Sequence, residues 1–178
     1  MEHKRPDSLY AYGLLFKILE YMILLPVTIG FLFLSAQSVI LAFVQLLHPV
    51  STMTPDILGG YLTVFLLGMF GSFMCLVNAN QRPDIRISDD GLRIRVFFFW
   101  WLPIPWEEVR SIRRPIVLSL SGTYLVTVAR LTFVHRFVGY MYGKVFEPAF
   151  LIMPSLAGHA EVIATIKEKA VQSEASER

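Results

Sequence analysis

The chain has 178 residues, of which 54% are hydrophobic, with a mean hydropathy of +0.54 and a formal net charge of +2. This composition is too apolar for an ordinary soluble domain, and the single cysteine, Cys75, excludes an internal disulfide or a thiolate metal site. Residues 80–146 carry ten basic groups against five acidic ones, an excess that suits anionic lipid headgroups.

Residues 1–20 are predicted to form an N-terminal tail and an interfacial lead-in. From Leu9 to Glu20 the apolar residues recur at helical spacing, with Lys17 interrupting the pattern. We therefore expect a few helical turns that run continuously into the next segment.

Residues 21–79 are predicted to form a transmembrane hairpin, with spans at about 21–47 and 57–77. Neither span contains a charged residue, and each exceeds the roughly 20 residues that cross a hydrocarbon core of about 30 Å. A cleaved signal peptide is the competing interpretation, but its apolar region would be only about 7 to 15 residues long. The length of the first run therefore favours a retained span.

The turn between the spans, His48–Asp56, contains two prolines and no Lys or Arg, whereas basic residues flank the other ends of both spans. The positive-inside rule then places both termini in the cytoplasm, in a multi-pass protein of the cell (inner) membrane. Because neither span carries an ionisable group at depth, the hairpin is expected to be an anchor and not a transport pathway.

Small residues mark one face of each span. Gly68 and Ser72 lie one turn apart on the second span, and Ser38 and Ala42 offer a matching face on the first. Such pairs allow close helix approach in membranes. We expect this face to pack on the other helix or on a partner subunit.

Residues 80–172 are predicted to form a cytoplasmic domain that begins with a β-hairpin. Apolar residues alternate with Arg86, Arg93 and Arg95 on either side of an Asp-Asp-Gly turn at 89–91. The three arginines therefore share the outer face. They are candidates for binding lipid headgroups, although alternating arginine is also typical of any solvated strand.

An aromatic run at 97–101 follows this hairpin. Its five rings cannot all point into one small core, so two interpretations stay open. Trp100 and Trp101 either lie at the membrane interface, as Trp does in interfacial belts, or pack on the rest of the sheet.

The remaining chain is predicted to be mostly strand. Strands are expected at 104–112 and 116–120, a long strand or bent pair at 124–137, a turn bracketed by Gly139 and Gly143, and a last strand at 149–153. A helix capped by Ser155 follows, and residues 173–178 are predicted to form a disordered tail. The predicted class is α+β, with six or seven antiparallel strands closed by one C-terminal helix.

Three motifs of the cytoplasmic part resemble those of the bacterial PH-like domain family, which is found on small two-span membrane proteins. They are Ile-Ser-Asp-Asp-Gly-Leu-Arg-Ile (87–94), Ile-Pro-Trp-Glu-Glu-Val-Arg-Ser-Ile (104–112) and Phe-Leu-Ile-Met-Pro (150–154). Val109 stands where the family pattern has Ile. The resemblance covers roughly residues 84–170 and implies a PH-type β-barrel or paired sheets. The arginine spacing also resembles that with which eukaryotic PH domains hold phosphoinositide headgroups.

No catalytic motif emerges from the sequence. His135 and His159 are isolated, and neither a phosphate-binding loop nor a nucleophile motif is present, so we expect no enzyme, cofactor or metal site. The expected function is an interaction scaffold or accessory subunit of a membrane complex, with a membrane-protein partner or self-association and no nucleic acid. The alternative is an anionic-lipid headgroup-binding module, and an uncharacterised membrane enzyme ranks last.

Overall fold

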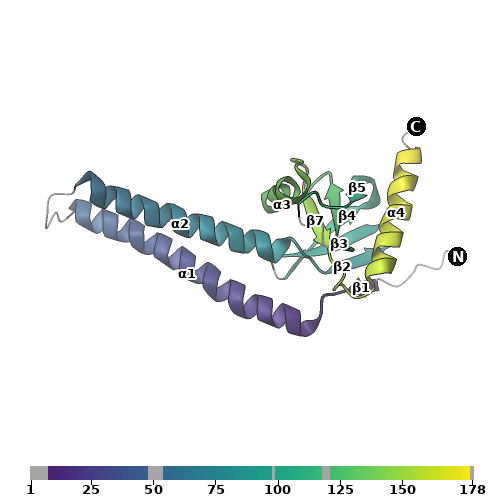
Figure 1. The fold of residues 1–178 in the computed structure, drawn as a ribbon, viewed down its shortest axis with the longest axis horizontal. Helices are drawn as coiled ribbons and strands as arrows, with labels where there is room; N and C mark the ends of the chain where they lie inside the picture. Colours follow the sequence, from purple (N-terminus) through teal and green to yellow (C-terminus); the bar gives the residue numbers. More distant parts are fainter. Residues whose placement is uncertain (1–7, 48–53, 98, 118–120, 177–178) are drawn as a thin grey trace. The chain divides into compact units, whose positions relative to one another are not determined.

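The structure, a computed structural model, describes residues 8–47, 54–97, 99–117 and 121–176 (Figure 1). It consists of two compact units. One is a helical hairpin, Ile18–Leu76, and the other combines the described parts of Met1–Lys17 and Val77–Arg178. The second unit is called the sheet domain below.

The hairpin is built from α1 (Leu14–Leu47) and α2 (Pro55–Asn80), which run antiparallel (Figure 1). Both predicted apolar runs are confirmed as helices that are long and apolar enough to cross a membrane. Most of their large apolar side chains are exposed, unlike those of a helix inside a soluble core. Most of the predicted turn, residues 48–53, lies outside the described residues.

The first sheet of the sheet domain has the order β1-β2-β3-β4 and is antiparallel throughout. Its strands are β1 (Ser8–Tyr10), β2 (Ile85–Ser88), β3 (Gly91–Val96) and β4 (Trp100–Pro105). The predicted hairpin at 85–96 is therefore confirmed as β2 and β3, with the arginines on one face.

The N-terminal strand β1 corrects the predicted helical lead-in. Residues 8–10 pair with β2, with Ser8 opposite Ile87 and Tyr10 opposite Ile85, and the helix begins only at Leu14. Pairing with a neighbouring strand outweighs the local helical spacing, because it buries the Tyr10 ring in the core. The hairpin is consequently an insertion between β1 and β2 of a single domain.

The second sheet has the order β5-β6-β7 and is also antiparallel. A short 3₁₀ turn, η1 (Trp106–Glu108), leads into it. Its strands are β5 (Val109–Arg113), β6 (Tyr124–Val128) and β7 (Ala149–Ile152). The core contains inward-facing residues of both sheets, among them Ile85, Ile94, Val126 and Phe150, which are almost fully buried.

Helix α3 (Phe133–Gly143) occupies a stretch that the sequence predicts as strand and turn, so that prediction is wrong. Val134, Val138 and Tyr142 recur every four residues and are buried. Gly143 is the last residue of α3, and a Cβ there would lie 2.6 Å from Leu125 Cδ2. Its lack of a side chain lets α3 approach the second sheet closely. The valine and aromatic residues of this segment also favour a strand, so its helical spacing was not recognised.

The C-terminal helix α4 (His159–Ser176) is confirmed, although it begins at His159, several residues after Ser155, and continues past Gln172. Its buried residues Val162, Ile163 and Ile166 belong to the core. In Figure 1, α3 and α4 lie on opposite sides of the strands. The fold is thus α+β, with two apolar helices, two antiparallel sheets and a C-terminal helix.

Candidate functional site

The outer face of the first sheet presents the three predicted arginines together. Arg86 on β2 lies directly opposite Arg93 on β3, and Arg95 lies opposite Trp101 on β4. The Arg86 guanidinium stands 4.3 Å from the centre of the Trp101 ring, and that of Arg95 stands 5.9 Å from it. We call Arg86, Arg93, Arg95 and Trp101 the arginine face. It has the donors to bind an anion and an aromatic surface that orients them.

The three arginines differ in how much charge they offer a ligand. Arg95 forms an ion pair with the buried carboxylate of Asp84. Arg93 is exposed and Arg86 is half-buried, and neither forms an ion pair with another described residue. Like charges placed directly opposite on paired strands repel, so the Arg86–Arg93 pair is unfavourable until an anion lies between the two side chains. The positive charge of this pair is therefore the least compensated on the arginine face.

Asp84 is the centre of a buried ionic cluster that the sequence analysis missed. Its carboxylate pairs with Arg95, lies 3.1 Å from Lys17 Nζ, and accepts the Tyr12 backbone N–H at 3.2 Å. Asp84 and Lys17 are both buried. The cluster joins the residues that lead into α1 to the residues that follow α2. The sequence does mark this residue, because Asp84 is the one acidic residue between positions 57 and 88.

The aromatic run contains both packed and exposed rings, and its placement at a membrane interface stays a prediction. Phe97 packs against the core, whereas Phe99 and Trp100 are exposed, at 66% and 61%, and their rings make an edge contact with centroids 5.3 Å apart. Trp101 lies under the arginines, and Phe98 is outside the described residues. Of the two membrane-interface candidates, Trp100 is thus the exposed one and Trp101 is half-buried.

The residues at the end of α2 are bound into the sheet domain by side-chain and backbone hydrogen bonds. Asn80 Oδ1 accepts the Phe97 N–H at 2.8 Å, and the Gln81 carbonyl accepts the Leu151 N–H at 2.7 Å. The Tyr142 hydroxyl donates to Gln81 Oε1 at 2.6 Å, and burial raises the pKa of this phenol, which keeps it protonated as the donor. Both sheets and α3 therefore meet at residues 80 and 81.

The small residues of the hairpin do not all lie where the sequence placed them. Gly68 packs on Ser35 and Phe31 of α1, one turn before Ser38, and Ser72 is buried with its hydroxyl bonded to Gly68 O. Ser35 Oγ also lies 3.3 Å from Phe65 O on the other helix. The close contact predicted for this face thus forms within the hairpin.

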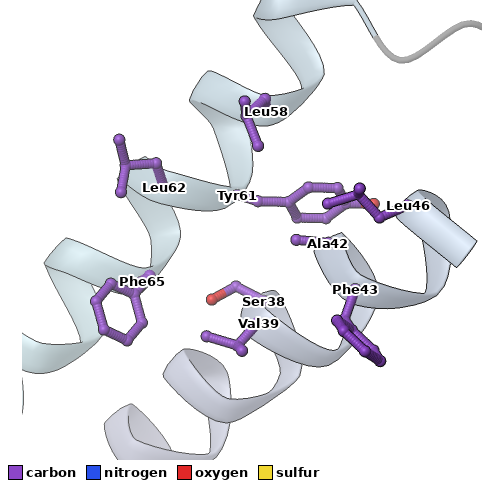
Figure 2. Close-up of a pocket in the computed structure, with 9 residues that line it drawn as sticks. All are labelled: Ser38, Val39, Ala42, Phe43, Leu46, Leu58, Tyr61, Leu62 and Phe65. Atoms are coloured by element: carbon purple, nitrogen blue, oxygen red, sulfur yellow. The ribbon is translucent and has the colours of Figure 1, made fainter.

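Ser38 and Ala42 line an apolar groove of about 300 Å³ between the two helices (Figure 2). Tyr61 and Phe65 of α2 face them across the groove, and the Tyr61 ring extends toward Ala42 (Figure 2). The Ser38 hydroxyl bonds the Ser35 carbonyl at 2.8 Å and so adds little polarity. The lining of the groove is therefore mostly apolar.

His135 and His159 both make local contacts within the sheet domain. His135 is fully buried, its Nδ1 lies 2.7 Å from Thr132 Oγ1, and burial lowers its pKa to about 4, so it is neutral at pH 7. His159 Nε2 lies 2.7 Å from the Gly122 carbonyl at the start of α4. No group of three or more His, Cys, Asp or Glu within the described residues could hold a metal ion.

Comparisons of the chain with protein-family models, with curated proteins and with solved structures find no match.

Proposed function

We propose that this protein is a non-enzymatic, membrane-anchored interaction module whose arginine face binds anionic lipid headgroups. In this proposal α1 and α2 cross the cell membrane, both chain termini lie in the cytoplasm, and the sheet domain, with a PH-like arrangement, lies at the inner leaflet. The paired antiparallel sheets and the closing helix α4 support the PH-like arrangement.

The observation that carries the proposal is the direct cross-strand opposition of Arg86 and Arg93. Side chains of directly opposite residues can reach the same ligand, and each guanidinium can donate two hydrogen bonds to phosphate oxygens. Trp101 holds Arg86 in place, because the guanidinium stacks over its ring. A phosphate between the arginines would replace their repulsion by two charge-assisted hydrogen bonds.

Asp84 supports headgroup binding by the Arg86–Arg93 pair, because it compensates the charge of only one of the three arginines. Its ion pair with Arg95 neutralises the arginine nearest the buried cluster and leaves the half-buried Arg86 and the exposed Arg93 as the cationic centre of the face. A headgroup is therefore expected to depend on Arg86 and Arg93 more than on Arg95.

The experiment uses the full chain, because a fragment that starts after α2 would lack β1 and Lys17 of the same domain. The protein in mild detergent is titrated with short-chain phosphatidylglycerol or phosphatidylcholine, and bound lipid is counted by native mass spectrometry. We expect a preference for phosphatidylglycerol. Each basic group near the surface contributes about 1 kcal/mol, so the double variant Arg86→Ala/Arg93→Ala loses roughly 2 kcal/mol, about 30-fold in affinity.

The matched control is Arg110→Ala/Arg130→Ala, which removes the same charge from two exposed arginines off the arginine face. It is expected to keep the preference. An equal loss in both double variants would mean that only net charge matters, and an unchanged preference after loss of Arg86 and Arg93 would refute headgroup binding at this face.

The groove between α1 and α2 favours a second candidate function, an accessory subunit of a larger membrane complex. Its apolar lining fits side chains of another membrane helix, and small residues on its α1 wall permit close approach. Purification in mild detergent tests this candidate. A stoichiometric membrane-protein partner is expected if it holds, and a chain that purifies alone would count against it.

A further inference from the structure

The end of helix α3 and the loops beside it form an exposed apolar patch that the arginine face does not explain. Tyr140 and Phe146 are 51% and 79% exposed, and their rings stack with centroids 5.1 Å apart. Ile116 and Val117 are also exposed, and the Ile116 N–H donates to the Tyr142 carbonyl at 2.8 Å, which places both beside the end of α3. We call Ile116, Val117, Tyr140 and Phe146 the α3 patch. A cluster of this kind on a protein surface marks a contact with an apolar partner.

The charges next to the α3 patch are mainly positive. Arg114, Arg136 and Lys144 are exposed and adjoin its members in sequence or on the helix, and Glu147 is the acidic neighbour. The inner side of α3, with Val134 and Val138, is buried against the second sheet. The α3 patch is therefore an apolar, partly aromatic surface rimmed by cations, a composition that suits a membrane interface.

The end of α3 is bonded to the residues that directly follow α2, and this favours the membrane as the partner of the α3 patch. The Tyr142 hydroxyl bonds Gln81, which is four residues beyond Val77, where the apolar run ends. Four residues at 1.5 Å rise cover about 6 Å, and the headgroup layer is about 5 to 7 Å thick. If α2 spans the bilayer, Gln81 and the Tyr142 hydroxyl bonded to it therefore follow the end of the apolar run within about the thickness of the headgroup layer along the chain.

We propose that the α3 patch inserts into the interface of the membrane that α2 crosses, so that α3 is a second, in-plane membrane contact of the sheet domain. The inference rests on the spanning hairpin of the proposed function. It does not depend on headgroup binding by the arginine face. Tyr and Phe supply the apolar contact, and the cationic rim attracts anionic headgroups.

Spin labels on single cysteines test this placement in the full chain. Labels are attached in a Cys75→Ala background at Phe146→Cys, at Ala164→Cys on the exposed side of α4 as control, and at Leu67→Cys on α2 as lipid reference. The protein is reconstituted into vesicles of phosphatidylcholine and phosphatidylglycerol. Collisions with oxygen, which concentrates in lipid, are compared with collisions with a water-soluble nickel chelate.

We expect the oxygen-to-nickel ratio at position 146 to be several-fold above that at 164 and below that at 67. Should Phe146→Cys fail to fold, Val117→Cys reports on the same patch. A ratio at 146 equal to that at 164, with 67 in lipid, would overturn this inference alone. Shielding of 146 from both reagents would overturn it in favour of a protein partner or second copy, and a water-exposed label at 67 would overturn the spanning hairpin as well.

Discussion

At the scale of single residues, the most consequential group is the Asp84 carboxylate. Removing a carboxylate from water is costly, and the cost is offset here by Lys17, Arg95 and the Tyr12 N–H. These partners come from two separate stretches of the chain, residues 12–17 and strand β3. The cluster therefore fixes how the segment entering α1 meets β3, and it also sets which arginines remain available on the outer face.

Asp84→Ala is expected to lower the free energy of unfolding of the sheet domain by about 3 to 5 kcal/mol, because it leaves the buried Lys17 ammonium without its counterion. Chemical denaturation of the detergent-solubilised chain, followed by tryptophan fluorescence, measures the loss. Glu168→Ala on the exposed side of α4 removes the same charge and serves as control. A loss no larger than that of the control would contradict the role given to Asp84.

At the scale of elements, the sequence predicts the helices and strands that have a long apolar run or a strict alternation of apolar and polar residues. The two apolar helices follow from uninterrupted hydropathy, and β2 and β3 follow from strict alternation around a tight turn. Helix α3 could not be predicted in the same way, because valine and aromatic residues fit a strand as well as a helix. Its helical state depends on tertiary packing through Gly139 and Gly143.

The contact between α1 and α2 gives a prediction at this scale. A Cβ at Gly68 would meet Ser35 Oγ and lie 2.8 Å from the Phe31 carbonyl, whereas nothing lies within 4 Å of one at Gly59. Gly68→Ala is therefore expected to destabilise the hairpin by about 1 to 3 kcal/mol. Gly59→Ala is expected to be neutral or stabilising by up to about 1 kcal/mol through helix propensity.

Thermal unfolding in detergent, followed by circular dichroism, compares the two glycine variants. Equal melting temperatures for Gly68→Ala and Gly59→Ala would show that the close approach at Gly68 does not stabilise the hairpin.

At the scale of the whole molecule, the sheet domain is discontinuous in sequence. β1 precedes the hairpin and β2 follows it, so the hairpin occupies the connection between two paired strands. The sequence shows the hairpin and the later strands but not this pairing, because three residues at 8–10 carry too short a pattern to identify a strand. The arginine face was predicted from alternation, whereas its ionic partners Asp84 and Lys17 depend on that long-range pairing.

This topology also brings two connections to the same end of the first sheet. Connections in an antiparallel meander alternate between the two ends of the strands, so the β1–β2 connection, which contains the hairpin, and the β3–β4 connection share one end. The exposed Phe99 lies in the latter and the exposed Trp100 begins β4, and the backbone N–H of Phe97 in the same connection bonds to Asn80, the last residue of α2.

The most direct test of this account is the sidedness of two cysteines in otherwise cysteine-free full chains, Ser51→Cys in the connecting turn and Ala164→Cys on α4. Intact cells that express each variant are treated with a membrane-impermeant maleimide before and after permeabilisation. The account predicts labelling of position 51 in intact cells and of position 164 only after permeabilisation. Labelling of both positions from the same side would contradict a hairpin that spans the membrane and returns the chain to complete one domain.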